Sequence, residues 1–287
     1  MMVADEPTML LSIAADDGGL LRLGVFASFL LGFMALEMIR PRRRVEADRR
    51  RRWPLNIAFS LAITTMFAVL PLLAAGAAAW AEARSIGVFN LVDGPWWLEA
   101  IAGFLLLDMV LYWQHRWFHR VPFFWRFHRV HHSDRHLDTT SGVRFHPGEA
   151  LVSLGIKIVA IVLLGPAVWL VLLFEMILNA ASLFNHSNLA LGSSDRWLRW
   201  FIVTPEMHLV HHSRLPGEAN HNFSFFLSVW DRLFDSYQAR PVCGIDGMEL
   251  GLEEVGDTAS LSFGALMALP LRHRPHGRMS PLKSEAG

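Results

Sequence analysis

Five long apolar stretches limit what this chain can fold into. They cover residues 19–39, 54–80, 96–113, 149–164 and 166–184. A run of about 20 apolar residues is long enough for a helix to cross the hydrocarbon core of a bilayer. Hydrophobic residues make up 53% of the chain and charged residues 18%, a balance that favours a membrane protein over a soluble one. We therefore predict an all-α fold with four to five membrane segments.

The fourth and fifth stretches are separated by Gly165-Pro166, a pair that ends a helix and marks a turn. We predict a helix hairpin at this point. Each arm is near the lower length limit for a span, so the hairpin either crosses the bilayer or dips into it. Glu175 lies inside the second arm. Because a charge is costly at this depth, we expect its carboxylate to face protein rather than lipid.

Arginines indicate the orientation of these stretches. The segment PRRRVEADRRRRW follows the first stretch, whereas the loop at 81–94 carries a single basic residue, Arg84. Basic loops stay in the cytoplasm, so the first loop is predicted inside and the second outside. The chain is then inside again at 114–148 and from residue 185 onward. Residues 1–18 are acidic and lack the positive start of a secretory signal.

Histidines at helical spacing form the second informative pattern. HRWFHRVPFFWRFHRVHH contains an H-x3-H box followed by an H-x2-HH box, and HLVHH repeats the second box. Positions i, i+3 and i+4 share one helix face, so each box can direct its imidazoles into a common space. The box histidines are His115, His119, His128, His131, His132, His208, His211 and His212. Eight imidazoles exceed the needs of one ion, and we predict two metal ions in a cytoplasmic helical cap.

Other kinds of site are excluded or disfavoured. The single cysteine, Cys243, leaves no thiolate metal site and no disulfide framework. The chain has no P-loop, no dinucleotide-binding glycine fingerprint, no GxSxG elbow and no HExxH motif. Its net charge of zero gives no indication of a nucleic-acid partner.

Three further histidines are candidate metal ligands. His186 stands where the hairpin returns to the inside, and we include it among the predicted ligands as a ninth histidine. His146, in RFHPGE, and His221, in NHNF, are weaker candidates. For His146, packing at the start of a helix is the alternative.

A carboxylate is expected to orient one of the imidazoles. Asp108 lies seven residues before His115, about two helical turns, and therefore on the same face. We predict that Asp108 pairs with a histidine or with Arg116 and so supports the catalytic site from outside the ligand set. Weaker candidates for this supporting role are Asn185, Glu206, Asn220, Asn222 and Asp231.

The donor set and its place beside a membrane suit oxidative chemistry. Neutral imidazoles leave a metal ion with most of its charge, which favours binding and reductive activation of O2 over hydrolysis. The C–H bonds of a lipid have no acid–base handle, so a metal-bound oxidant is needed to attack them. Two alternatives stay open. One is a non-catalytic membrane protein that binds metal, and the other is a metal-dependent lipid hydrolase, although the boxes contain no carboxylate base.

These residues resemble the fatty acid hydroxylase superfamily, also called the sterol desaturase family. The resemblance covers residues 40 to 240 and includes the three boxes, RFHPGE, NHSN, TPEMHLVHHS and NHNFSFFLSVWDRLFDSY. It implies an integral membrane enzyme with two iron ions, replaceable by zinc in purified protein, that uses O2 to hydroxylate or desaturate a lipid. Electrons would come from a separate protein, cytochrome b5-like or ferredoxin-like. The chain itself carries no haem-attachment, flavin or iron–sulfur motif.

The resemblance has departures that affect the substrate end. Asp235-Ser236 stands where the family has Gly-Thr, Ser224 replaces a glycine, and Ala190 replaces a histidine of some relatives. The substrate class stays open among sterol, fatty acyl chain, carotenoid and ether lipid. We divide the chain into a short N-terminal segment (1–18), a membrane-embedded hydroxylase domain (19–240) and a C-terminal amphipathic segment with a tail (241–287). Within the last, 261–271 is predicted either on the membrane surface or in the core.

Overall fold

The computed structural model describes residues 6–44, 49–70, 73–255 and 261–272. These residues form helices, loops and isolated bridges, with no named strand among them, so the prediction of an all-α fold is confirmed. The longer helices are α1 (Glu6–Ile39), α2 (Arg49–Ala68), α3 (Ala74–Glu82), α5 (Trp96–Arg120), α6 (Pro122–His132), α7 (Pro147–Leu164) and α8 (Val168–His186). The shorter ones are α4 (Val88–Leu91), η1 (Thr139–Val143), η2 (Gly192–Ser194), α9 (Asp195–Leu198), α10 (Pro205–His211), α11 (Pro216–Ala219), α12 (Val229–Leu233), α13 (Gly244–Gly247), η3 (Glu253–Val255), α14 (Phe263–Met267) and η5 (Leu269–Leu271).

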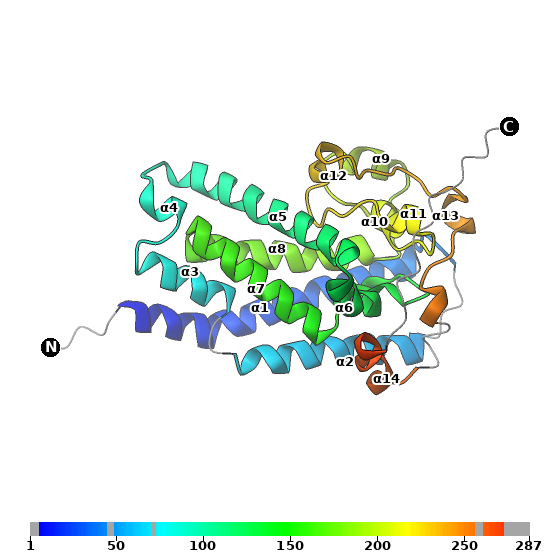
Figure 1. Cartoon of the computed structure of the whole chain (residues 1–287), viewed down its shortest axis with the longest axis horizontal. Helices are drawn as coiled ribbons and strands as arrows, with labels where there is room; N and C mark the ends of the chain where they lie inside the picture. The colour runs from blue at the N-terminus through cyan, green and yellow to red at the C-terminus, as the bar shows by residue number, and fades with distance from the viewer. Residues whose placement is uncertain (1–5, 45–48, 71–72, 256–260, 273–287) are drawn as a thin grey trace.

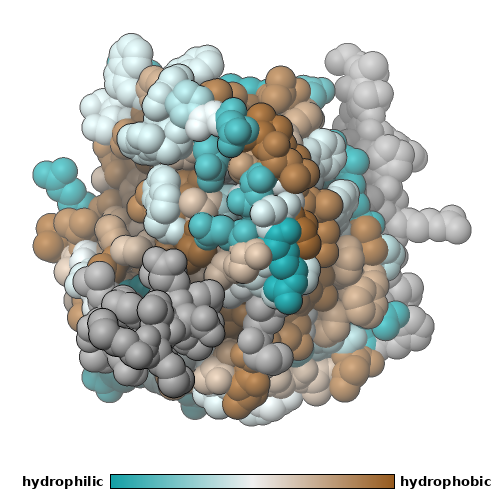
Figure 2. Space-filling view, turned by 90° about the vertical axis from the view of Figure 1, so that its left-hand side faces the viewer, coloured by the Kyte–Doolittle hydropathy of each residue, from teal (hydrophilic) through white to brown (hydrophobic). Residues whose placement is uncertain are grey.

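Four helices in the described part of the chain are long and apolar enough to cross a membrane. They are Arg22–Ile39 within α1, Trp96–Arg120, Pro147–Leu164 and Val168–His186. All four run along the long axis of the molecule (Figure 1). At the end that carries α3 and α4, hydrophilic side chains gather near the middle and hydrophobic ones surround them (Figure 2). The number of spans agrees with the prediction, and the chain is a membrane protein.

The second apolar stretch does not form the single crossing predicted for 54–80. The chain divides it between α2, which ends at Ala68, and α3, which begins at Ala74. The first residues of α2 are arginines, and its apolar part from Leu55 onward is shorter than the roughly 17 residues that a span needs. The two helices follow one another along the bundle and together return the chain to the end opposite the start of α2 (Figure 1).

The hairpin turn lies where the sequence predicts it. Gly165 has a φ of 69° and donates its N–H to the carbonyl of Ile161 at 2.7 Å, which closes the last turn of α7. A Cβ on Gly165 would lie 2.5 Å from Nδ2 of Asn90 and 2.7 Å from the carbonyl oxygen of Ile86. Both the left-handed backbone and the close approach of α4 and the loop before it therefore require glycine here.

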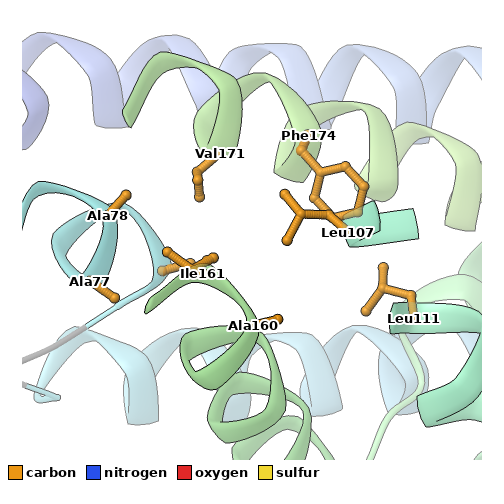
Figure 3. Packing of buried hydrophobic residues seen from close by; sticks show 9 residues of the cluster. Ala77, Ala78, Leu107, Leu111, Ala160, Ile161, Val171 and Phe174 are labelled. Carbon is orange, nitrogen blue, oxygen red and sulfur yellow. The ribbon is translucent and has the colours of Figure 1, made fainter. Parts of the chain in front are cut away.

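A hydrophobic cluster joins the span helices to α3. Alanines at helical spacing give α3 a narrow face, which lets α7 and α8 pack close to it, as expected for helices that associate in lipid. Figure 3 shows Ala77 and Ala78 of this face near Ile161 of α7 and Val171 of α8, with Phe174 further along α8 beside Leu107. The buried members are Ala74, Ala77, Ala78, Leu107, Leu111, Ala160, Ile161, Val171 and Phe174.

Glu175 is paired within the protein, as predicted. Its carboxylate accepts from Nζ of Lys157 on α7 at 2.9 Å and from the guanidinium of Arg22 on α1 at 3.0 Å. These ion pairs link three of the four candidate spans. A charge in a bilayer is tolerated when it faces such partners, so the cluster ties α1 to the hairpin.

A cap covers the end of the bundle at which α5 and α8 finish; we use this name for residues 133–146 and 187–255. Buried ion pairs attach the cap to the helices beneath it. The guanidinium of Arg52 on α2 donates to Asp134 at 2.8 Å and to Asp138 at 2.6 Å. Oε2 of Glu37 on α1 accepts from the backbone and the hydroxyl of Thr139, both at 2.9 Å. The arginine block predicted to be cytoplasmic therefore lies at the cap end.

The segment 261–271 contributes leucines to the core, although its last residue, Leu271, is 85% exposed. Leu266 is fully buried and Leu269 nearly so, and both pack in a cluster with Phe59 of α2 and Val130 of α6. The alternative of a helix within the core, which the sequence left open, is the one observed. Because Val130 lies between the box histidines of α6, this packing also supports the back of that helix.

Candidate metal centre

A sharp corner between α5 and α6 turns the first histidine box toward the second. α5 ends at Arg120, and Pro122 begins α6 at the first helical position, where proline is well tolerated. The residue before a proline avoids helical backbone angles, and Val121 is extended with φ −92° and ψ 116°. α6 consequently folds back along α5, so that the imidazoles of the two helices face each other.

α8 and α10 bring the remaining histidines to the same place. His186 is the last residue of α8. α10 begins after Thr204, whose Oγ1 accepts from the backbone of Met207 at 3.3 Å and so caps the helix. This short helix directs the third box toward α6 and α8.

The histidines form two separate groups, in each of which the ligand nitrogens lie within 4.8 Å of one another. The first group is His115, His119, His128, His132 and His211; the second is His131, His186, His208 and His212. All nine are buried. Each adjacent pair of histidines supplies one member to each group, because consecutive residues on a helix point about 100° apart.

The spacing of the inward nitrogens fits a shared ion. In the first group the Nε2 atoms of His115 and His128 are 3.2 Å apart, and Nε2 of His132 lies 3.1 Å from those of His119, His128 and His211. In the second, Nε2 of His186 is 3.0 Å from those of His131 and His208, and the His208–His212 distance is 3.2 Å. Nitrogens bound at right angles to one ion, about 2.1 Å from it, would be about 3.0 Å apart.

The outward nitrogens are held by hydrogen bonds. Nδ1–H donates to a backbone carbonyl in four cases, namely His115 to Phe223 at 2.8 Å, His131 to Arg144 at 3.2 Å, His186 to Ser182 at 2.6 Å and His211 to His221 at 2.9 Å. In His128 it donates to Oε1 of Glu149 at 2.7 Å. A neutral imidazole has a single N–H. These bonds therefore fix the tautomer that leaves the Nε2 lone pair facing inward.

This arrangement fits a bound cation. His131 and His186 each donate from Nδ1, so two Nε2 lone pairs face each other at 3.0 Å. Protonating one of them is unfavourable, because burial and the neighbouring histidines lower the pKa of His131 well below 6.5. The pKa of His212, in the same group, is lowered well below 6.5 for the same reasons. A transition-metal ion between the lone pairs removes the repulsion, and the donors present fit it.

The predicted histidines can now be placed. All eight box histidines and His186 lie in the two groups. His146 and His221 lie outside them. Nδ1 of His146 accepts from the backbone of Gly148 at 2.9 Å and caps α7, which is the packing alternative. Nδ1–H of His221 donates to the carbonyl of Gly217 at 2.7 Å, while its own carbonyl holds His211.

The expected pairing of Asp108 with a histidine or with Arg116 is corrected by the structure. Oδ2 of Asp108 accepts from the backbone N–H of Leu227 at 3.0 Å and from Nε1 of Trp230 at 2.8 Å. Seven residues place Asp108 on the same face as His115, but also about 10 Å away along the helix axis. Its carboxylate therefore anchors the cap to the middle of α5 instead of orienting a metal ligand.

Glu149 is the carboxylate that orients an imidazole, and sequence reasoning did not select it. It lies in RFHPGE, three residues after His146, in the first turn of α7. Acidic residues are common in first helical turns, where they interact favourably with the helix dipole, so its position alone gave no signal. Only the packing of α7 against α6 places it beside His128.

Four of the five weaker candidates form hydrogen bonds with backbone groups, and the fifth pairs with an arginine. Asp231 accepts from the N–H of Phe223 at 2.7 Å and of Ser224 at 3.0 Å, and so holds the carbonyl that binds His115. Burial raises the pKa of Asp231 to about 6. The side-chain amide of Asn222 donates to the carbonyl of Met207 at 2.9 Å. The remaining three are Asn185, which donates to Phe225, Asn220, which donates to Pro216, and Glu206, which pairs with Arg42.

A bundle of apolar helices with two buried groups of histidines at one end defines a histidine-box membrane protein. Residues 100–236 match the family model described as fatty acid hydroxylase. The matched segment contains all three histidine boxes, and these findings support the resemblance of the chain to the fatty acid hydroxylase superfamily.

Curated relatives share about half of this chain. It is 28% identical over 147 residues to the ornithine lipid hydroxylase OlsE of Rhizobium tropici, a match that covers 51% of the chain and 44% of the relative. It is 29% identical over 153 residues to the alkylglycerol monooxygenase of Danio rerio, covering 52% and 33%. The human alkylglycerol monooxygenase is 28% identical over 159 residues, covering 53% and 33%. The chain thus spans less than half the length of these relatives, and no solved structure matches it significantly.

Proposed function

We propose that this protein is an O2-dependent lipid hydroxylase with a di-iron centre held by nine histidines. The observation that carries the proposal is the pair of adjacent buried groups whose Nε2 lone pairs point inward. Two irons bound there would supply the reductive activation of O2 that attack on an unactivated C–H bond requires. The first group would hold one ion and the second group the other.

The chain's own residues orient the ligands and keep water away. The carbonyl of Phe223 and the carboxylate of Glu149 fix the imidazoles of His115 and His128. Aromatic rings pack against the ligands: Phe145 stacks on His131 with centroids 4.4 Å apart, and Trp125 lies 5.1 Å from His119. A dry, preorganised surrounding of this kind protects a strong oxidant from side reactions.

The relatives favour a lipid as substrate and hydroxylation as the outcome. Their names describe a hydroxylase of ornithine lipid and a monooxygenase of alkylglycerol. Desaturation on the same centre is the alternative that a product analysis must exclude. We further propose that electrons come from a separate cytochrome b5-like or ferredoxin-like protein, since the chain contains no redox-cofactor motif.

The arginine block supports a cytoplasmic position for the metal centre. Arg42 and Arg43 contact Asn188 of the cap through their backbone N–H groups, at 2.8 and 2.9 Å. The basic residues and the histidine groups therefore share one end of the bundle. Basic segments beside spans stay on the cytoplasmic side.

The test combines metal content with labelled oxygen. Detergent-purified protein should hold about two irons per chain and, with reductant and membrane lipid, should transfer one atom of ¹⁸O2 into a lipid. His131→Ala and His211→Ala, one from each group, should abolish transfer while the protein still inserts. A lipid product that has lost two hydrogens and gained no oxygen would show that the reaction is desaturation rather than hydroxylation. Variable metal content without O2 consumption would overturn the enzyme proposal.

A further inference from the structure

An exposed apolar surface lies on the cap, away from the histidines. We call it the cap patch; its residues are Trp197, Trp200, Phe201, Val229 and Leu233, which are 44–71% exposed. They come from α9 with the loop after it and from α12. The two segments are joined by hydrogen bonds, from the N–H of Ser228 to the carbonyl of Phe201 at 3.2 Å and from Val203 to Phe226 at 2.9 Å. The patch is therefore one continuous surface.

The patch is fixed at a definite level along α5. Leu227, just before α12, and Trp230, within α12, both donate to Oδ2 of Asp108. Asp108 is twelve residues from either end of Trp96–Arg120, or about 18 Å along the axis. The ring of Phe226 also contacts that of Phe104, one turn further from the cap, at 5.7 Å. Because α5 is a candidate span, these contacts draw the segment down beside its membrane-facing length (Figure 1).

The apolar surface of α5 continues onto the patch. Ile101 and Leu105 are exposed on successive turns of α5. Two turns later the ring of Trp113 is covered by Phe234, with centroids 4.9 Å apart. Where α12 covers α5, the outer surface is formed by Val229 and Leu233 of α12 instead of by residues of α5. A contiguous apolar face of this kind marks contact with another apolar phase rather than with water.

Arginines lie over the aromatic rings of the patch. The guanidinium of Arg232 lies 4.7 Å from the ring of Trp200, and that of Arg196 lies 5.1 Å from the ring of Trp197. Arg232 also donates to the carbonyl of Arg199 at 2.6 Å, which holds it in place. Tryptophan and basic side chains together are typical of the border between hydrocarbon and headgroups, where rings enter the apolar side and cations reach phosphates.

We propose that the cap patch is immersed in the bilayer, in the headgroup and outer acyl region of the leaflet at the cap end. The patch would then form a membrane-embedded surface that does not span. Residues just before it touch the metal centre, since the carbonyl of Phe223 holds His115 and the ring of Phe225 lies 6.0 Å from that histidine. One segment, residues 223–233, thus contributes both to the surroundings of the histidine groups and to the cap patch. The inference does not depend on the hydroxylase activity.

Spin labels can test the immersion in lipid nanodiscs. The single cysteine, Cys243, is exposed on the cap and provides a reference position in the unmodified chain. In a Cys243→Ser background, Phe201→Cys and Leu233→Cys place labels on the patch, and Leu105→Cys places one on the exposed face of α5. Collision with O2, which concentrates in lipid, is compared with collision with a water-soluble nickel chelate. A size-exclusion profile and a thermal unfolding transition like those of the unmodified chain confirm that each labelled variant is folded.

Immersion predicts that both patch labels behave like the label at 105, with nickel collisions several-fold lower than at 243 and high O2 collisions. Nickel collisions as frequent as at 243 would overturn the proposal and leave the patch as a water-exposed surface. Protection from both reagents would also overturn it, because the patch would then be covered by protein, such as a second copy of the chain.

Discussion

Glu149→Gln tests whether a buried carboxylate sets the metal affinity of the first histidine group. Oε1 of Glu149 accepts from Nδ1–H of His128 at 2.7 Å, and both side chains are buried. Glutamine keeps an acceptor oxygen but cannot carry the negative charge with which an ionised carboxylate would strengthen His128 as a metal ligand. It also places an amide N–H2 where Oε2 now has no hydrogen-bond partner among the described residues. The substitution therefore weakens ligation without removing a ligand.

The expected loss is confined to one ion. Changing the partner of a metal-bound histidine lowers affinity about 10- to 100-fold, or about 1.4–2.7 kcal/mol. His128 belongs to the first group, so iron bound by the second group should keep its affinity. In a competition with a chelator, the variant should therefore release about one iron per chain at a chelator concentration at which the wild type retains about two.

Two controls separate this effect from general damage. Glu99→Gln makes the same change in the first turn of α5, where the carboxylate accepts from the N–H of Ala167 at 3.0 Å, and it should keep both irons. Asp108→Asn changes the carboxylate that sequence spacing favoured, and it should also keep both because the hydrogen bonds of Asp108 come from Leu227 and Trp230. Wild-type affinity in Glu149→Gln would refute the role of Glu149. Equal loss of both irons would refute the independence of the two groups.

Other predictions address the ninth ligand, the hairpin and pH. His186→Ala should reduce iron from about two to about one per chain, since only the second group loses a donor; unchanged content measured by metal analysis would remove His186 from the ligand set. Gly165→Ala should lower the free energy of unfolding by about 1–3 kcal/mol through backbone strain, and so lower the unfolding temperature in detergent, while Gly155→Ala, with nothing near its Cβ, should not. Metal-free protein should lose stability as pH falls below about 6.5, because the histidines of the unfolded chain then bind protons that buried His131 and His212 do not bind. Thermal unfolding at pH 7 and pH 5 measures this loss. A stability that does not change with pH would contradict the prediction.

Local patterns predicted the parts of the fold that depend on local chemistry. Gly165-Pro166 marked the hairpin because a left-handed residue followed by proline ends a helix almost regardless of its surroundings. The box spacing identified the eight histidines because helical periodicity fixes which residues share a face. His186 was found for a different reason, since the topology returned the hairpin to the side on which the boxes lie.

What the sequence did not reveal depends on contacts between distant segments. Spacing placed Asp108 on the face of His115, but the axial distance and the docking of residues 227–230 gave its carboxylate other partners. Glu149 contacts His128 only through the packing of α7 on α6. The apolar part of α2 is short because the helix begins with arginines, of which Arg52 is held by Asp134 and Asp138 of the cap.

The two H-x2-HH boxes explain why the structure has two groups rather than one larger cluster. On α6, His128 and His132 are four residues apart and share the first group, while His131, one residue before His132, points to the second. On α10, His208 and His212 share the second group and His211 joins the first. Each helix thus gives its i, i+4 pair to one group and its odd histidine to the other, in opposite sense. Each of the two adjacent groups therefore contains histidines from both helices. A movement of either helix would disturb both groups together. Independent backbone anchors on each helix, the carbonyls of Arg144 for His131 and of His221 for His211, resist such movement.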